Sequence, residues 1–173
     1  MNRNAARRGA VPNQLRRSQA GFSLIELLIV VAIILIVAAI AIPNLMRARM
    51  AANEAGAAEA LRTITTGETT YSAACPDIGY SATLMELHTG VLCAGGKNCI
   101  DDVLGASDPS TKNGYQFTYL PIAVAGLNSS FTATSVPVAP GASGQRAFFT
   151  DQTGIIRYTL NGAIPTPTSS ALQ

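Results

Sequence analysis

One carboxylate stands inside the most apolar stretch of the chain. Residues 22–42 read FSLIELLIVVAIILIVAAIAI, and Glu26 is the only ionisable side chain among them. An ionised group at the centre of a bilayer costs about 2.5–3.5 kcal/mol or more, so an acid in such a run usually has a partner or a function. The chemistry that Glu26 offers is therefore charge pairing in an apolar environment.

Catalytic chemistry is not expected elsewhere in the chain. His88 is the only histidine, no Ser/His/Asp or Cys/His arrangement stands out, and no two carboxylates are paired for acid–base work. Asp101, Asp102 and Asp108 offer oxygen ligands, but they lack the ordered spacing of a calcium loop, and a solvated acidic loop is favoured. We therefore expect no enzyme, no cofactor and no metal site.

The apolar run and its flanking charges predict one membrane-spanning helix. Twenty-one helical residues reach about 31 Å, which is close to the hydrocarbon thickness of a bilayer. The run is preceded by five arginines and no acid: Arg3, Arg7, Arg8, Arg16 and Arg17. The positive-inside rule then keeps the N-terminus in the cytoplasm and sends the rest of the chain outward, into a compartment where disulfides persist.

The charge that follows this leader argues against nucleic-acid binding. The whole chain carries +2, but the part after Gly21 holds ten acidic and seven basic residues, a net charge of −3. Binding of DNA or RNA usually needs a basic patch. No nucleic-acid partner is therefore expected.

Composition divides the chain into five segments. They are a basic leader (1–21), a hydrophobic helix (22–43), an amphipathic helix (44–75), a globular head (76–162) and a flexible tail rich in Pro, Thr and Ser (163–173). A narrow apolar stripe follows three-to-four spacing through Ala57, Leu61, Ile64 and Tyr71. Pro43 interrupts the pattern between the two helical segments, where it either ends the helix or kinks it.

The C-terminal half has the pattern of strands. About four are expected, at 115–119, 130–138, 145–150 and 154–160, after a short helix near 82–88. Residues 151–154, DQTG, predict a hairpin turn between the last two strands. Because a sheet cannot bury its apolar face alone, the stripe of the amphipathic helix should cover it. The expected fold class is α+β, with a long N-terminal helix half packed on an antiparallel sheet.

The sequence GFSLIELL at residues 21–28 carries a family resemblance. With the arginine-rich leader before it and the apolar run to Pro43 after it, it resembles the class III signal peptide of type IV pilins and type II secretion pseudopilins. The signature covers about residues 16–45 and is highly specific. The helix and sheet that follow are similar to the general pilin-like plan, but less specifically.

The resemblance implies a prepilin that is processed and then polymerised. A membrane prepilin peptidase would cut between Gly21 and Phe22 on the cytoplasmic side and N-methylate the new amine of Phe22. The protein would wait in the inner membrane until an assembly ATPase and an inner-membrane platform protein move it into a helical homopolymer. There, Glu26 would pair with the Phe22 amine of a neighbouring copy.

Physical chemistry agrees with these steps. Gly21 has no side chain, so an extended backbone can lie closely in a protease cleft. A cut before the apolar run keeps the membrane anchor, whereas a conventional signal peptide is cut after its apolar core. An unpaired charge in a low-dielectric core is strongly unfavourable, so pairing of Glu26 would select the register of neighbouring copies. The alternative without a role in assembly is a signal-anchor helix with Glu26 at the membrane interface.

The preferred interpretation is a structural subunit of an extracellular type IV pilus, held in the inner membrane by one span before assembly. Two alternatives stay open. A type II secretion pseudopilin would form a short periplasmic piston filament, and a minor pilin would have a binding role at the filament tip.

Three cysteines lie in the outward part of the chain. Cys93 and Cys99 enclose five glycine-rich residues, which favours a disulfide between them. Cys75 would then be a buried, unpaired thiol. Bonds from Cys75 to Cys93 or to Cys99 are the alternatives.

Overall fold

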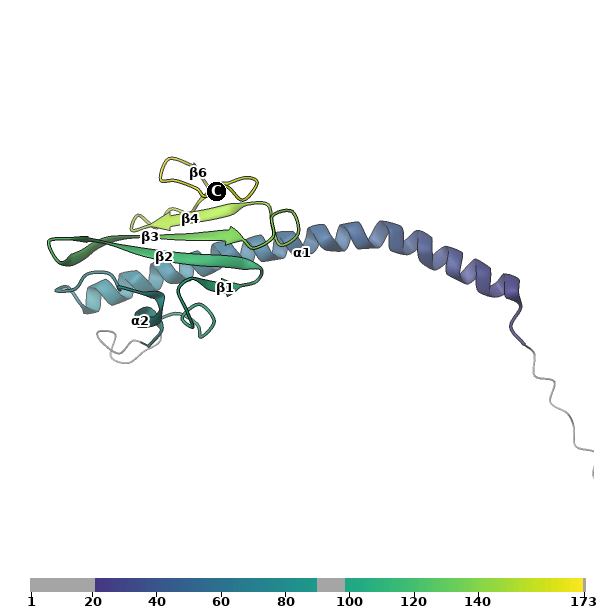
Figure 1. The fold of residues 1–173 in the computed structure, drawn as a ribbon, viewed down its shortest axis with the longest axis horizontal. Helices are drawn as coiled ribbons and strands as arrows, with labels where there is room; N and C mark the ends of the chain where they lie inside the picture. Colours follow the sequence, from purple (N-terminus) through teal and green to yellow (C-terminus); the bar gives the residue numbers. More distant parts are fainter. Residues whose placement is uncertain (1–20, 90–98, 173) are drawn as a thin grey trace, which may run out of the picture. The chain divides into compact units, whose positions relative to one another are not determined.

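The computed structural model describes residues 21–89 and 99–172. Helix α1 (Leu24–Ala74) comes first and the short helix α2 (Leu84–Thr89) second. The strands follow: β1 (Ser110–Lys112), β2 (Tyr115–Val124), β3 (Leu127–Pro137), β4 (Ala147–Asp151), β5 (Arg157–Thr159) and β6 (Ser170–Ala171). Figure 1 shows β2, β3 and β4 side by side along the second half of α1. The expected α+β arrangement is confirmed.

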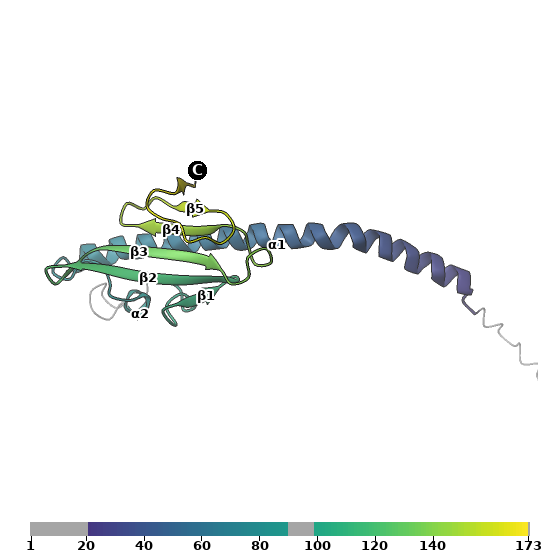
Figure 2. The ribbon, with the colours of Figure 1, turned by 45° about the horizontal axis from the view of Figure 1, so that its top comes forward.

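The strands form one antiparallel sheet in chain order, β1 to β6, which Figure 2 shows at an angle. Asn113 and Gly114 join β1 to β2, and Ala125 and Gly126 join β2 to β3; all four have positive φ. Such two-residue turns match the twist of the strands they connect, and Asn-Gly is the favoured pair. These turns therefore explain why β1 pairs with β2 and why β2 pairs with β3.

The sheet has six strands where about four were expected. Strands β1 and β6 have only three and two residues, which is too short for an alternating pattern to be recognised. β6 also lies inside residues 163–173, which were expected to form a flexible tail. Leu172 N donates to Ile156 O at 2.7 Å, and Arg157 Nη1 donates to Ser169 O at 2.9 Å, so this segment is held on the sheet.

Helix α1 runs through Pro43 without a break, so Pro43 does not end the helix. The chain divides into two compact units, residues 1–40 and 41–173, and α1 contributes to both. In the first unit, every described residue except the half-buried Ala38 is exposed. A kink at Pro43 remains a prediction.

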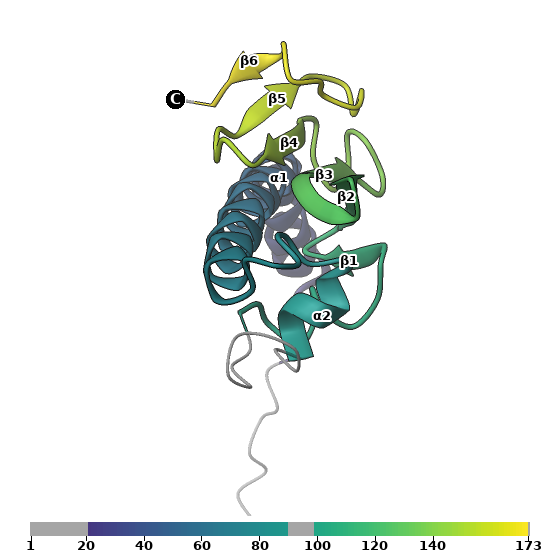
Figure 3. The ribbon, with the colours of Figure 1, turned by 90° about the vertical axis from the view of Figure 1, so that its left-hand side faces the viewer.

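In the second unit, α1 supplies the predicted apolar stripe. Ala57, Leu61, Ile64 and Tyr71 are each at most 1% exposed. Among the described residues, the strands contribute five buried aromatic side chains to the core that they share with α1: Tyr115, Phe117, Tyr119, Phe131 and Phe148. Figure 3 shows this part of α1 along one face of the sheet.

Glu54 fastens α1 to the segment before β4. Its carboxylate accepts hydrogen bonds from the Gln145 amide at 2.8 Å and from Arg146 Nε at 2.7 Å. Burial alone would raise the pKa of Glu54, but the bonds from Gln145 and Arg146 outweigh it and hold the pKa below its usual value of 4.5. The ionised form therefore stabilises the fold.

Glu68 joins α1 to the segment before α2 through hydrogen bonds, without an ion pair among the described residues. The side chain is fully buried and accepts from the Ser81 amide at 2.9 Å and from the Ser81 hydroxyl. The Tyr119 hydroxyl donates to Ser81 O at 2.9 Å. No cation faces Glu68 in these contacts, and burial raises its pKa despite the bonds from Ser81.

We predict that Glu68→Gln reduces the loss of stability as pH rises. A raised pKa in the folded state means that stability is greatest below the unfolded pKa and falls as pH rises through the folded pKa. Glutamine cannot ionise, so the variant should not show this loss. The free energy of unfolding of Glu68→Gln minus that of the native chain should therefore increase from pH 4 to pH 7. Denaturant titrations of the full chain in detergent measure this difference. A difference that does not change with pH contradicts the prediction, whereas Glu68→Leu should cost about 1–3 kcal/mol at both pH values.

We predict the opposite pH trend for Glu54→Gln. A lowered pKa contributes stability above the unfolded pKa that is lost as pH falls through the folded pKa. The variant should lose about 2 kcal/mol near pH 7, the scale of hydrogen bonds to charged groups, and less near pH 3. The control is Glu59→Gln, whose exposed carboxylate lies 3.1 Å from Arg62 and should contribute at most about 0.5 kcal/mol. Equal losses for Glu54→Gln at both pH values contradict the prediction.

Candidate functional site

The predicted cleavage residues lie in extended chain just before α1. Gly21, Phe22 and Ser23 precede the helix, and the first turn closes with a bond from Leu27 N to Ser23 O at 3.2 Å. The side chain of Phe22 is 82% exposed. Gly21 is exposed as well, and no atom of the described chain beyond its neighbours lies within 4 Å of the place that a side chain at Gly21 would take.

Glu26 lies in the first turn of α1 and is exposed. It makes no hydrogen bond or ion pair within residues 21–89 and 99–172. Ser23 and Glu26 have the Ser-x-x-Glu spacing of a capping box, which the sequence reasoning missed, and an acid near a helix N-terminus is favoured by the helix dipole. The structure thus brings Gly21, Phe22 and Glu26 to one helix end, with the acid available to a partner.

The part of α1 that follows is apolar, and almost all of its side chains are exposed. Large side chains between 40% and 80% exposed occur along it from Leu24 to Met46. Within the described residues, α1 is the one helix that is long and apolar enough to cross a membrane. A soluble monomer rarely leaves so long an apolar surface in water, so this segment needs lipid or protein around it.

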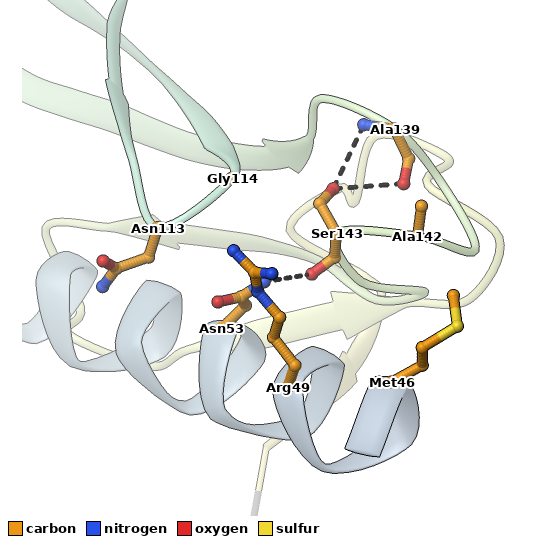
Figure 4. Close-up of a pocket in the computed structure, with 8 residues that line it drawn as sticks. All are labelled: Met46, Arg49, Asn53, Asn113, Gly114, Ala139, Ala142 and Ser143. Carbon is orange, nitrogen blue, oxygen red and sulfur yellow. Dashed lines mark hydrogen bonds between the residues drawn. The ribbon is translucent and has the colours of Figure 1, made fainter. Parts of the chain in front are cut away.

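A pocket of about 500 Å³ lies beside α1 in the second unit. Figure 4 shows Arg49 and Asn53 of α1 on one side, with the Asn113 turn and the segment from Ala139 to Ser143 around them. Asn53 Nδ2 donates to Ser143 O at 2.9 Å, and the Ser143 hydroxyl accepts from the Ala139 amide at 3.1 Å. Sequence reasoning did not find this pocket, because its walls come from segments about 90 residues apart.

The acidic residues considered as calcium ligands make other contacts. Asp101 accepts from Lys112 Nζ at 2.7 Å, and Asp108 accepts from the Tyr119 amide at 3.3 Å. Asp102 Oδ1 lies 3.8 Å from Nε2 of His88. Across the described residues, no three side chains of His, Cys, Asp or Glu gather where they could hold a metal ion.

The structure contradicts one expectation about the cysteines. Cys75 is buried and takes part in a disulfide, so the expectation that it is an unpaired thiol is wrong. The predicted Cys93–Cys99 disulfide stays a prediction. Cys93 lies outside the described residues, and Cys99 is half-buried.

Two comparisons with known proteins found a match. The family model described as the prokaryotic N-terminal methylation motif matches residues 16–42. The type IV wide pilus major component PilA4 of Thermus thermophilus is 63% identical over 38 residues, which are 22% of this chain and 29% of that protein. The match therefore spans under a third of that relative's length. No solved structure matches this chain.

The methylation motif coincides with the exposed Gly21-Phe22 bond and with Glu26 in the first helical turn. The second unit then packs α1 against an antiparallel sheet, as the pilin-like plan requires. This chain therefore carries the N-terminal methylation motif and is similar, over 38 residues, to a type IV pilus major component.

Proposed function

We propose that this prepilin is cut between Gly21 and Phe22, N-methylated on Phe22 and polymerised into an extracellular type IV pilus. The observation that carries the proposal is the exposed apolar half of α1, with a Glu26 in its first turn that has no partner among the described residues. Burial of that surface among identical helices removes it from water at about 25 cal/mol per Å² of apolar area. The partners that this requires are a prepilin peptidase, a platform protein, an assembly ATPase and other copies of the chain.

Charge pairing in the polymer follows from the same residues. Cleavage creates a positive amine on Phe22, four residues before Glu26. Within an apolar helix bundle, a lone carboxylate is strongly unfavourable and a paired one much less so. The amine of one copy beside Glu26 of the next would therefore fix the axial register, while apolar contacts supply most of the cohesion.

The relative from Thermus thermophilus is described as the major component of a wide pilus, which favours a pilus subunit over a pseudopilin. Electron microscopy of material sheared from cells that express the chain tests this choice. Long surface fibres labelled by an antibody against residues 100–172 are expected. Fibres confined to the periplasm would instead indicate a type II secretion pseudopilin.

We predict that Gly21→Leu blocks processing. A side chain at this position should keep the backbone out of the narrow peptidase cleft, so the precursor accumulates. Mass spectrometry of the chain co-expressed with a prepilin peptidase should find an N-terminal methylated Phe22 in the native chain and an intact leader in the variant. Ala20→Leu, the same bulk one residue earlier, is the control and should still be cut. Native material that retains Met1 contradicts the proposal.

We predict that Glu26→Ala is processed but polymerises poorly. The variant leaves the Phe22 amine of a neighbour without its counter-charge, so filament yield should fall about tenfold or more. Sheared filaments and processed membrane protein are quantified from the same cells. Glu59→Gln, which removes an exposed acid of the second unit, should assemble normally. Native filament yield in Glu26→Ala would show that the charge pair does not govern assembly.

A further inference from the structure

We propose that the pocket between Arg49, Asn53, Asn113 and Ser143 binds the phosphate headgroup of an anionic membrane lipid while the subunit waits in the bilayer. The inference rests on one part of the proposed function, the insertion of residues 22–42 in a membrane. It does not depend on processing or polymerisation.

The pocket lies at the right distance along α1. Met46 and Arg49 line it and come four and seven residues after Ile42, the last residue of the apolar run. Since α1 is continuous here, a rise of 1.5 Å per residue places them about 6 and 10 Å beyond that residue. The headgroup layer extends about 5–8 Å beyond the hydrocarbon core on each side. Met46 falls within this distance, and the long side chain of Arg49, which tilts toward the N-terminus of the helix, can reach back into the layer.

The pocket carries a cation that nothing in the described chain neutralises. Arg49 makes no hydrogen bond or ion pair within residues 21–89 and 99–172, and no acid lines the pocket. The next acid along α1 is Glu54, which already binds Arg146 through Nε at 2.7 Å. A guanidinium presents paired N–H donors that match the oxygens of a phosphate.

The other walls suit an amphiphilic ligand. The exposed Asn113 has a side-chain amide with no hydrogen-bond partner within the described chain, and it supplies a second donor. Met46 is 53% exposed and adds apolar surface beside the cation. A volume of about 500 Å³ holds a phosphate ester and its first carbon atoms, because a water molecule takes up about 30 Å³. Apolar surface beside the charge favours a lipid over free phosphate.

The test is native mass spectrometry of the full chain in detergent, titrated with phosphatidylglycerol or with phosphatidylcholine. Every variant carries glutamine at the five leader arginines, so that the leader does not capture anionic lipid. The native pocket should bind phosphatidylglycerol more tightly than phosphatidylcholine. Arg49→Gln should weaken phosphatidylglycerol binding about tenfold or more, the scale of charge-assisted hydrogen bonds, and leave phosphatidylcholine unchanged.

Two matched variants separate the pocket from a general surface charge. Arg47→Gln removes an exposed arginine of the same helix that does not line the pocket, and its effect should not exceed about fivefold. Ala142→Glu places a carboxylate in the pocket wall and should abolish the preference for phosphatidylglycerol, whereas Ala142→Gln should keep it.

Several outcomes would overturn the proposal. If Arg47→Gln and Arg49→Gln lose the same affinity for phosphatidylglycerol, the binding comes from general positive charge at the membrane surface and not from the pocket. If millimolar inorganic phosphate competes for the pocket as well as the lipid does, the ligand is a free anion and not a lipid. Lipid-independent dimers that disappear in Arg49→Gln would assign the pocket to an acidic side chain of a second copy.

Discussion

Removal of the first half of α1 from water is the constraint on which the molecule depends. From Leu24 to Met46 the helix is apolar, and its large side chains are exposed. Neither a membrane nor a bundle of identical helices tolerates an unpaired ion well, yet Glu26 stands in the first turn. Lipid covers the apolar side chains only, whereas in the proposed polymer the free amine of a neighbouring copy would also pair with the acid. The same segment therefore suits a membrane-held subunit and a polymer.

The second half of α1 meets a different requirement. Small residues such as Ala57, Ala58 and Ala60 are buried and allow the helix to lie close to the aromatic face of β2, β3 and β4. Glu54 and Glu68 then add directional bonds to two separate segments of the head. One carboxylate is held ionised by an arginine, and the other is surrounded by hydroxyl and amide groups. Their opposite pKa shifts follow from that difference in partners.

Pro43 marks the change between these two environments in the sequence. Helix α1 continues through it, so a proline within an otherwise helical pattern did not act as a stop. The residues before Pro43 are apolar. Arg47 and Arg49 come just after it, and the buried side chains of the packed half follow them. In the sequence, the two basic residues thus follow the apolar segment, and Arg49 lines a pocket of the second unit.

The sequence by itself determined the features that depend on neighbours along the chain. The Gly21-Phe22 motif, the position of Glu26 and the stripe from Ala57 to Tyr71 follow from local spacing, because helical periodicity decides which side chains share a face. The tertiary structure alone decided the rest. The partners of Glu54 lie 91 and 92 residues away. They include backbone amides, which cannot be identified as partners from the residue types in the sequence. Strands β1 and β6 are likewise too short to show a period, so only pairing with β2 and β5 makes them strands.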